Sequence, residues 1–314
     1  MTEKQLKIYW NTLLGSSGKQ EALKKERKNI LATISYPKSF YRFRPVTEST
    51  LEELEQNYMY FSSADHYDDP FDTYMRVDIP RLLKMVDDIN GDPSVVLSII
   101  KEHFPSLDLK DFNKENLKLH VLFPSSEDIM KLRQNMQTDT YSVCFCESAK
   151  NESSWMKYAD NHKGFVLEYN FSPEFIEELW RSKTLSANLF PVYYSGKKYD
   201  ATDYAVRNML LYMCRHIPYL YNELLRYMGW ENTKISLIKN KCHQYDKEWR
   251  LVPSFSLICR DCIRRKPQSI TIGLRTSKYT EQTIVAAAKM AGINEFYKME
   301  IDDKDRFVRK RIMG

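Results

Sequence analysis

Short strand-like segments recur along the whole sequence, and helical stretches separate them. Each segment is rich in aromatic and β-branched residues, a composition typical of β-strands. The segments cover residues 40–44, 58–63, 140–148, 165–172, 190–195, 246–255, 269–275 and 295–302. Because the strand content is dispersed among helices, the sequence predicts an α+β fold.

Helical periodicity dominates three stretches between these segments. Residues 3–31 are rich in Lys and Glu and carry apolar residues at helical spacing, and the same spacing recurs at about 76–138 and 200–240. A length of 314 residues fits one elaborated domain as well as two. The predicted boundaries are a helical lead-in at 1–38, a single α+β domain with two helical insertions at 39–302, and a basic, solvated tail at 303–314.

The amino-acid composition and net charge limit the kinds of protein and ligand to be considered. The chain is 43% hydrophobic and 28% charged, which is typical of a soluble globular protein with a sizeable core. Its 47 Lys and Arg exceed its 42 Asp and Glu by a formal +5, which falls short of the basic stripe of a nucleic-acid binder but suits a phosphate-bearing ligand. Because no signal peptide or apolar span is visible, we expect a cytoplasmic protein with no membrane contact. The alternative is an effector secreted without a signal peptide.

The 6 cysteines are too few and too scattered for a disulfide scaffold, so reduced thiols are expected. Cys259 and Cys262 form a CxxC pair, and Cys144 and Cys146 form a CxC pair. A structural zinc site usually shows two tight ligand pairs at recognisable spacing. We therefore expect no metal, and a zinc site that includes Cys242, Cys259 and Cys262 remains the alternative.

Glu248 is the charged residue that most needs an explanation, because it lies inside the strand-like segment "DKEWRLVPSF". Glutamate is a poor strand former and is costly to bury without a partner. One interpretation is an edge strand with charges facing water, or a pair of Glu248 with Arg250 on one face. The other is a carboxylate that points into a cleft and takes part in chemistry.

Arg42 and Arg44 alternate with Tyr41 and Phe43 in the segment "FYRFRP", so the two arginines share one face of the expected strand. Planar guanidinium groups can bind a pyrophosphate through paired hydrogen bonds. The alternative is ion pairing at the surface. We expect Glu248 and at least one of these arginines to converge on one cleft.

The loop "ADHYDDPFDTYM" gathers Asp65, His66, Asp68 and Asp69. Such a cluster can hold a divalent metal or act in acid–base chemistry, but Asp-rich loops more often form hydrogen-bonded turns. Common motifs for nucleotide triphosphatases, serine hydrolases, metalloproteases and dinucleotide-binding folds are absent from the sequence.

Four segments taken together resemble the bacterial family catalogued as domain of unknown function 2971. They are "FYRFRP", "LEELEQNYMYFSSADHYDDPFD", "SVCFCESAKNESSWMKYADNHKGFVLEYN" and "YDKEWRL", and the resemblance runs from about residue 40 to 275. The chain departs from the family pattern at Tyr67, Asp68, Cys146 and Lys157, so no catalytic role is drawn from those departures.

The order of the segments also resembles the ADP-ribosyltransferase superfamily. That resemblance implies a split, mostly antiparallel sheet, with NAD as substrate and Glu248 as the catalytic carboxylate that stabilises the ribosyl cation. It also implies an NAD-binding set. We expect the members of that set to be Arg42, Arg44, Tyr60, Ser62, Ser63 and Tyr67.

The sequence therefore predicts an NAD-using, ADP-ribosyltransferase-like enzyme that modifies a protein or a nucleic acid in bacterial conflict, defence or an effector role. Two other classes remain open. One is a non-catalytic module that binds a nucleotide or a partner. The other is a metal-dependent nucleic-acid enzyme built on the Asp/His loop.

Overall fold

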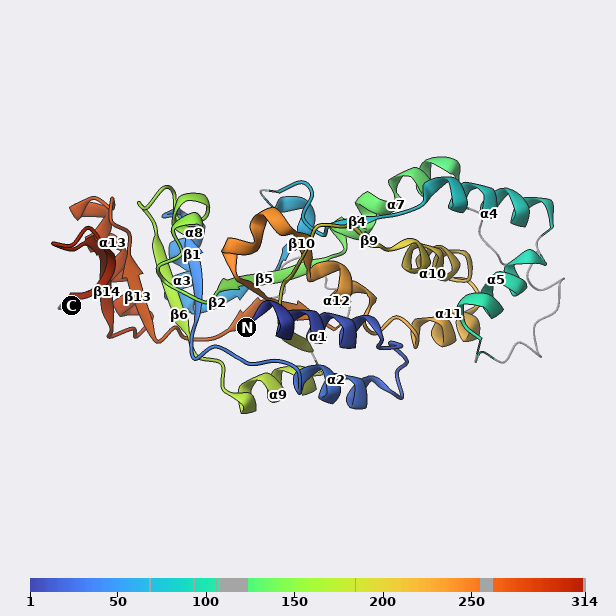
Figure 1. Ribbon diagram of the computed structural model, residues 1–314, viewed down its shortest axis with the longest axis horizontal. Coiled ribbons are helices and arrows are strands. Elements are labelled where there is room, and N and C mark those ends of the chain that lie inside the picture. The colour runs from blue at the N-terminus through green and yellow to red at the C-terminus, as the bar shows by residue number, and fades with distance from the viewer. Residues whose placement is uncertain are drawn as a thin grey trace. The chain divides into compact units, whose positions relative to one another are not determined.

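The computed structural model describes residues 1–67, 69–92, 94–105, 107, 124–183, 185–254 and 262–312. The chain divides into two compact units, each assembled from three separate stretches (Figure 1). Unit 1 comprises residues Met1–Ile34, Ser63–Thr140 and Ser195–Asn240. Unit 2 comprises residues Ser35–Ser62, Tyr141–Tyr194 and Lys241–Gly314.

Unit 2 is built on an open sheet with the strand order β15-β14-β13-β6-β1-β5-β11-β7. Strands β13 and β14 pair in parallel, and the other neighbours along this path are antiparallel. The bounds are β1 Phe40–Arg44, β5 Tyr141–Cys146, β6 Phe165–Tyr169, β7 Ala187–Pro191, β11 Glu248–Pro253, β13 Ser269–Ile272, β14 Phe296–Ile301 and β15 Phe307–Ile312.

The register of the inner strands fixes which side chains share a face. Tyr41 of β1 lies opposite Cys146 of β5, and Cys146 lies opposite Glu248 of β11. Residues directly opposite each other in antiparallel strands point to the same side of the sheet. We call the side that carries Tyr41, Cys146 and Glu248 face A, and the opposite side face B.

Face B is aromatic. Phe40 alternates with Tyr41 and so points to face B, where its ring packs against Phe145 at 6.1 Å and Trp249 at 5.3 Å between centroids. Both contacts are edge to face, the arrangement that aromatic pairs prefer. These rings therefore form the core on this side of the sheet.

The α-helices in the described part of unit 2 are α3 Glu48–Gln56, α8 Glu152–Lys157, α9 Pro173–Arg181 and α13 Lys278–Met290. Helix α8 covers part of face A, because fully buried Trp155 joins Phe43, Cys146 and Val166 in one apolar cluster. Helix α13 connects the parallel strands β13 and β14 and contacts α3. Unit 2 also contains a small ribbon of β2 (Tyr58–Tyr60) and β12 (Cys262–Arg264), and the 3₁₀ helix η2 (Lys241–Asp246).

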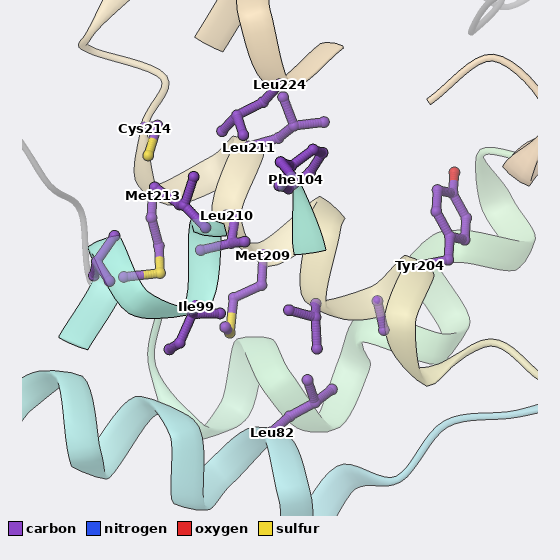
Figure 2. Packing of buried hydrophobic residues seen from close by; sticks show 14 of the residues in the cluster. Leu82, Ile99, Phe104, Tyr204, Met209, Leu210, Leu211, Met213, Cys214 and Leu224 are labelled. Atoms are coloured by element: carbon purple, nitrogen blue, oxygen red, sulfur yellow. The ribbon is translucent and has the colours of Figure 1, made fainter. Parts of the chain in front are cut away.

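Unit 1 is mainly helical. Its elements are α1 Glu3–Leu14, α2 Leu23–Leu31, η1 Ala64–His66, β4 Met75–Arg76, α4 Ile79–Gly91, α5 Val95–His103, α7 Ser126–Thr138, β9 Tyr199–Asp200, α10 Thr202–Met213, α11 Pro218–Leu225, α12 Glu231–Ser236 and β10 Ile238–Asn240. Figure 2 shows its core, where Leu82 of α4, Ile99 of α5, Leu210 of α10 and Leu224 of α11 pack together. The strands β3 (Ser62–Ser63) and β8 (Tyr193–Ser195) span unit boundaries.

The prediction of a mixed fold with a mostly antiparallel sheet and many helices is confirmed. The structure forms two units where the sequence predicts one domain at 39–302. Residues 1–34 of the predicted lead-in and both predicted helical insertions lie within unit 1. The sequence predicts a basic, solvated tail at 303–314, whereas Phe307–Ile312 forms strand β15, which pairs with β14 and whose residues are half-buried or exposed. Its Phe307, Val308 and Ile312 supply the strand propensity that its basic residues mask in the sequence.

Candidate functional site on face A of unit 2

Glu248 opens strand β11, which lies between β5 and β7 and so is an inner strand. Its side chain is only 7% exposed, and Arg250 Nε donates to Glu248 Oε1 at 2.6 Å. Arg250 is itself 1% exposed. The sequence-based alternative of an edge strand is therefore wrong, whereas the pairing of Glu248 with Arg250 is confirmed as a buried ion pair.

Two thiols lie beside this pair on face A. Burial, and next the charge of Glu248, raise the pKa of the Cys144 thiol to about 12. Burial also raises the pKa of Cys146, which contacts Ser154 Oγ at 3.2 Å. Both thiols are therefore protonated at neutral pH, so they act as small polar packing groups rather than as nucleophiles.

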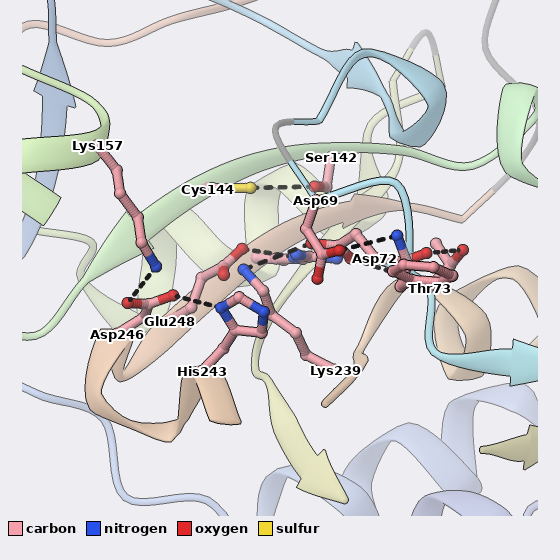
Figure 3. Close-up of polar contacts among 12 residues, drawn as sticks. Asp69, Asp72, Thr73, Ser142, Cys144, Lys157, Lys239, His243, Asp246 and Glu248 are labelled. Atoms are coloured by element: carbon pink, nitrogen blue, oxygen red, sulfur yellow. Dashed lines mark hydrogen bonds and ion pairs between the residues drawn. The ribbon is translucent and has the colours of Figure 1, made fainter. Parts of the chain in front are cut away.

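A second buried carboxylate, Asp246, lies two residues before Glu248 at the end of η2 (Figure 3). Ser153 Oγ donates to Asp246 Oδ1 at 3.1 Å, and Lys157 Nζ lies 3.5 Å from the same oxygen. His243 Nδ1 lies 3.8 Å from Asp246 Oδ2. The Asp246 side chain is 3% exposed, whereas Lys157 is 39% and His243 is 23% exposed, so the cluster runs from a buried carboxylate toward solvent.

The backbone around Asp246 is fixed by side-chain hydrogen bonds. Asn151 caps α8 by accepting from Ser154 N, and its Nδ2 donates to the carbonyl of Asp246 at 3.1 Å. Lys247 then adopts a left-handed φ of 45°, which is uncommon for a residue with a side chain. Tyr194 Oη accepts from Glu248 N at 2.8 Å. These contacts hold Asp246 and Glu248 in defined positions on either side of a tight bend.

Arg42 and Arg44 do not lie on this face. Both residues alternate with Tyr41, so the register that places Tyr41 and Glu248 on face A places both arginines on face B. The prediction that Glu248 and an arginine converge on one cleft is therefore wrong. Alternation along one strand predicts that two residues share a face, but only the register between strands decides which distant residues join them.

The two arginines are tied instead to Glu53 of α3. Arg44 Nη2 donates to both Glu53 carboxylate oxygens at 2.6 Å, and Arg42 Nη1 lies 3.8 Å from Glu53 Oε2. The Arg44 side chain is 23% exposed and the Arg42 side chain is 9% exposed. The predicted alternative of surface ion pairing is thus correct about pairing, although the pairs are largely buried.

The remaining predicted NAD contacts are divided between the units. Tyr60 lies on β2 and Ser62 at the end of unit 2, and both are exposed. Ser63 and Tyr67 belong to unit 1. There the Ser63 hydroxyl is bonded to Asp65 and lies 2.9 Å from His66 Nδ1, so local turn bonding accounts for its position.

The structure describes only some of the residues of the two predicted metal sites, the Asp/His loop and the cysteine cluster. Asp68 of the Asp/His loop and Cys259 of the CxxC pair lie outside the described residues. Within the described ranges, no group of three or more His, Cys, Asp or Glu side chains is placed to hold a metal ion. Cys242 is exposed and Cys262 is half-buried.

Sequence reasoning missed Asp246, His243 and Ser153 as members of this site. One signal was available, because Asp246 and Glu248 are spaced by two residues and so tend to face the same side of an extended segment. The contribution of Ser153 and Lys157 from α8 had no such signal, since about 90 residues separate them from Asp246.

The arrangement combines two buried carboxylates, a half-buried imidazole, an ammonium and a guanidinium, contributed by η2, α8 and the start of β11. Such a set can stabilise positive charge through its carboxylates and can exchange a proton through its histidine.

No family model, curated protein or solved structure matches the chain. Both resemblances therefore stay predictions. In the part of the chain that the structure describes, no helix has the length and apolar character needed to cross a membrane.

Proposed function

We propose that unit 2 is an ADP-ribosyltransferase-like enzyme that takes ADP-ribose from NAD and transfers it to a protein or a nucleic acid. The observation that carries this proposal is the Glu248 carboxylate, buried on an inner strand and held by Arg250 at 2.6 Å. A carboxylate kept in place by a buried partner is preorganised, so it needs no reorganisation when a positive charge develops beside it. The resemblance to the superfamily supplies the substrate class.

The proposed reaction breaks the bond between ribose C1′ and the nicotinamide nitrogen, and the electron pair leaves with nicotinamide. The ribose then carries positive charge, which the negative charge of Glu248 stabilises in the transition state. An oxygen or nitrogen of the acceptor bonds to C1′ and loses its proton. In this proposal His243 accepts that proton, and Asp246, 3.8 Å from His243 Nδ1, stabilises the imidazolium that forms.

The test is release of nicotinamide from NAD by the full chain, with and without candidate acceptors. Glu248→Gln keeps the shape of the side chain and removes its charge, so turnover should fall by roughly 10²-fold or more. Glu300→Gln is the matched control, because Glu300 lies on strand β14 and pairs only with exposed Lys310 at 3.2 Å among the described residues. Equal turnover in the Glu248 variant and the parent would exclude this role for Glu248.

A second candidate is a binding module that takes up NAD or a related nucleotide without cleaving it. One observation favours it: the arginines expected to bind the pyrophosphate lie on face B, away from Glu248. This candidate predicts NAD binding by calorimetry with no nicotinamide release under any acceptor condition. Nicotinamide release that depends on Glu248 would rule it out.

A further inference from the structure

Arg42, Arg44 and Glu53 form a charged cluster inside face B of unit 2. Two guanidinium groups share one carboxylate, so the cluster carries one surplus positive charge. The side chains are 9%, 23% and 14% exposed, respectively. Buried charges are normally paired, because desolvation of an isolated ion is costly. A surplus cation in this position therefore calls for a further anion.

The hydrogen bonds of the cluster are unevenly distributed. Glu53 accepts from Arg44 Nη2 with both carboxylate oxygens at 2.6 Å, whereas its contact with Arg42 Nη1 is 3.8 Å long. That distance allows charge attraction but exceeds a hydrogen bond. Arg44 Nε is buried and has no hydrogen-bond partner within the described part of the chain. Donors on both arginines are thus left for another acceptor.

The electrostatics of Arg44 agree with this imbalance. Burial, and next the charge of Arg42, lower the pKa of Arg44 to about 10, although the charge and the hydrogen bonds of Glu53 act in the opposite direction. Tyr169 also acts on Arg44, but burial raises the pKa of Tyr169 to about 12, so its phenol is neutral. Among the described residues, Glu53 is the carboxylate whose ion pairs with Arg44 and Arg42 are observed.

We propose that Arg42 and Arg44 form a binding site for a phosphate group on face B, separate from the Glu248 site on face A. A phosphate oxygen pair matches the planar fork of a guanidinium and would supply the missing acceptors and the missing negative charge. Access runs through the exposed part of Arg44, whose side chain is 23% exposed. Tyr60 of β2 is an aromatic side chain of the same unit and is 36% exposed.

Tyr60 distinguishes two sources of this phosphate group. Free phosphate would use the arginines alone, whereas a nucleotide could also stack its base on an exposed aromatic ring. The proposal of this site rests on the charges and hydrogen bonds of face B and does not depend on the proposed reaction at Glu248.

The experiment measures binding of orthophosphate and of ADP to the full chain by titration calorimetry at constant ionic strength. Arg44→Gln should weaken both ligands by at least about 10-fold, because one charged hydrogen-bond donor is lost. Glu53→Gln should act in the opposite direction and tighten both, because it removes the carboxylate that competes with the ligand. Arg311→Gln is the control, since it removes the same charge from an exposed position on β15 and should leave affinity unchanged.

Folding of the variants is checked in the same samples by thermal unfolding. Glu53→Gln leaves two arginines without their carboxylate, so it should lower the melting temperature. Added phosphate should then raise the melting temperature of Glu53→Gln by more than it raises that of the parent.

ADP that binds more tightly than orthophosphate assigns the site to a nucleotide, provided that Tyr60→Ala abolishes the difference. Equal affinity of both ligands assigns it to the phosphate group alone. Phosphate and ADP that bind neither the parent nor Glu53→Gln, or that bind Arg44→Gln as tightly as the parent, overturn the proposal.

Discussion

The buried pair of Glu248 and Arg250 makes a quantitative prediction about the stability of unit 2. The two charged atoms lie 2.6 Å apart, and the side chains are 7% and 1% exposed. At that distance the Coulomb attraction is about 6 kcal/mol for an effective dielectric constant of about 20. Desolvation of both ions cancels much of this gain, so the net cost of removing one partner is expected to be about 3–5 kcal/mol.

Arg250→Met is the sharpest perturbation, because methionine fills similar space and carries no charge. We expect it to lower the free energy of unfolding of unit 2 by about 3–5 kcal/mol in the parent. In the Glu248→Gln background the same change should lower the free energy of unfolding by at least about 2 kcal/mol less, because it no longer leaves a buried carboxylate unpaired. Lys310→Met is the control, since the exposed pair of Lys310 with Glu300 should contribute less than about 1 kcal/mol.

The assay is urea unfolding followed by pulsed hydrogen exchange and mass spectrometry, which reports each unit through its own peptides. Peptides from β11, which carries the pair, and from its neighbour β5 provide the unfolding curve of this part of unit 2. An Arg250→Met cost that is the same in the parent and in the Glu248→Gln background would refute a strong interaction between the two charges. The site would then lack the preorganisation on which the proposed chemistry depends.

Three further predictions concern the frame around the site. Gly164→Ala should prevent normal folding of unit 2, because the added Cβ would lie 2.2 Å from the carbonyl oxygen of Arg44, whereas Gly196→Ala has free space around it and should change the melting temperature little. Burial, and next Arg275, lower the pKa of His162, so its neutral form adds stability above its ordinary pKa of about 6.5 that is lost as the pH falls below that value. His162→Asn, which suits the left-handed φ of 69°, should reduce the loss of melting temperature between pH 7.5 and pH 5.5, because asparagine does not titrate in this range. Trp155→Ala should cost about 3–5 kcal/mol in urea unfolding, because this side chain is 0% exposed, and a cost below about 1 kcal/mol would show that α8 is not anchored by it.

Local sequence patterns were sufficient to locate most of the sheet of unit 2. Segments 40–44, 140–148, 165–172 and 246–255 contain β1, β5, β6 and β11, because aromatic and β-branched residues favour strands wherever the chain runs. Strand β15 was missed because seven of the twelve residues at 303–314 are charged, a composition that favours a solvated tail. Its hydrogen-bonded partner β14 is what makes it a strand.

The composition of the site could not be obtained from those patterns. Arg42 and Arg44 do share one face, as their alternation predicts, and Glu248 does pair with Arg250. The register that joins Tyr41, Cys146 and Glu248 was not predictable, because it is set by contacts between segments about 100 residues apart. Asp246 likewise becomes part of the site only when α8 brings Ser153 and Lys157 to it.

The most direct test of the central claim is the rate of a single turnover of nicotinamide release at saturating NAD, compared for the parent, Glu248→Gln and Arg44→Gln. If face A carries the chemistry and face B only binds an anion, Glu248→Gln should lower the rate by roughly 10²-fold or more while Arg44→Gln leaves it unchanged. A rate that is unaffected by Glu248→Gln, or lowered as much by Arg44→Gln, would contradict the assignment of the two faces.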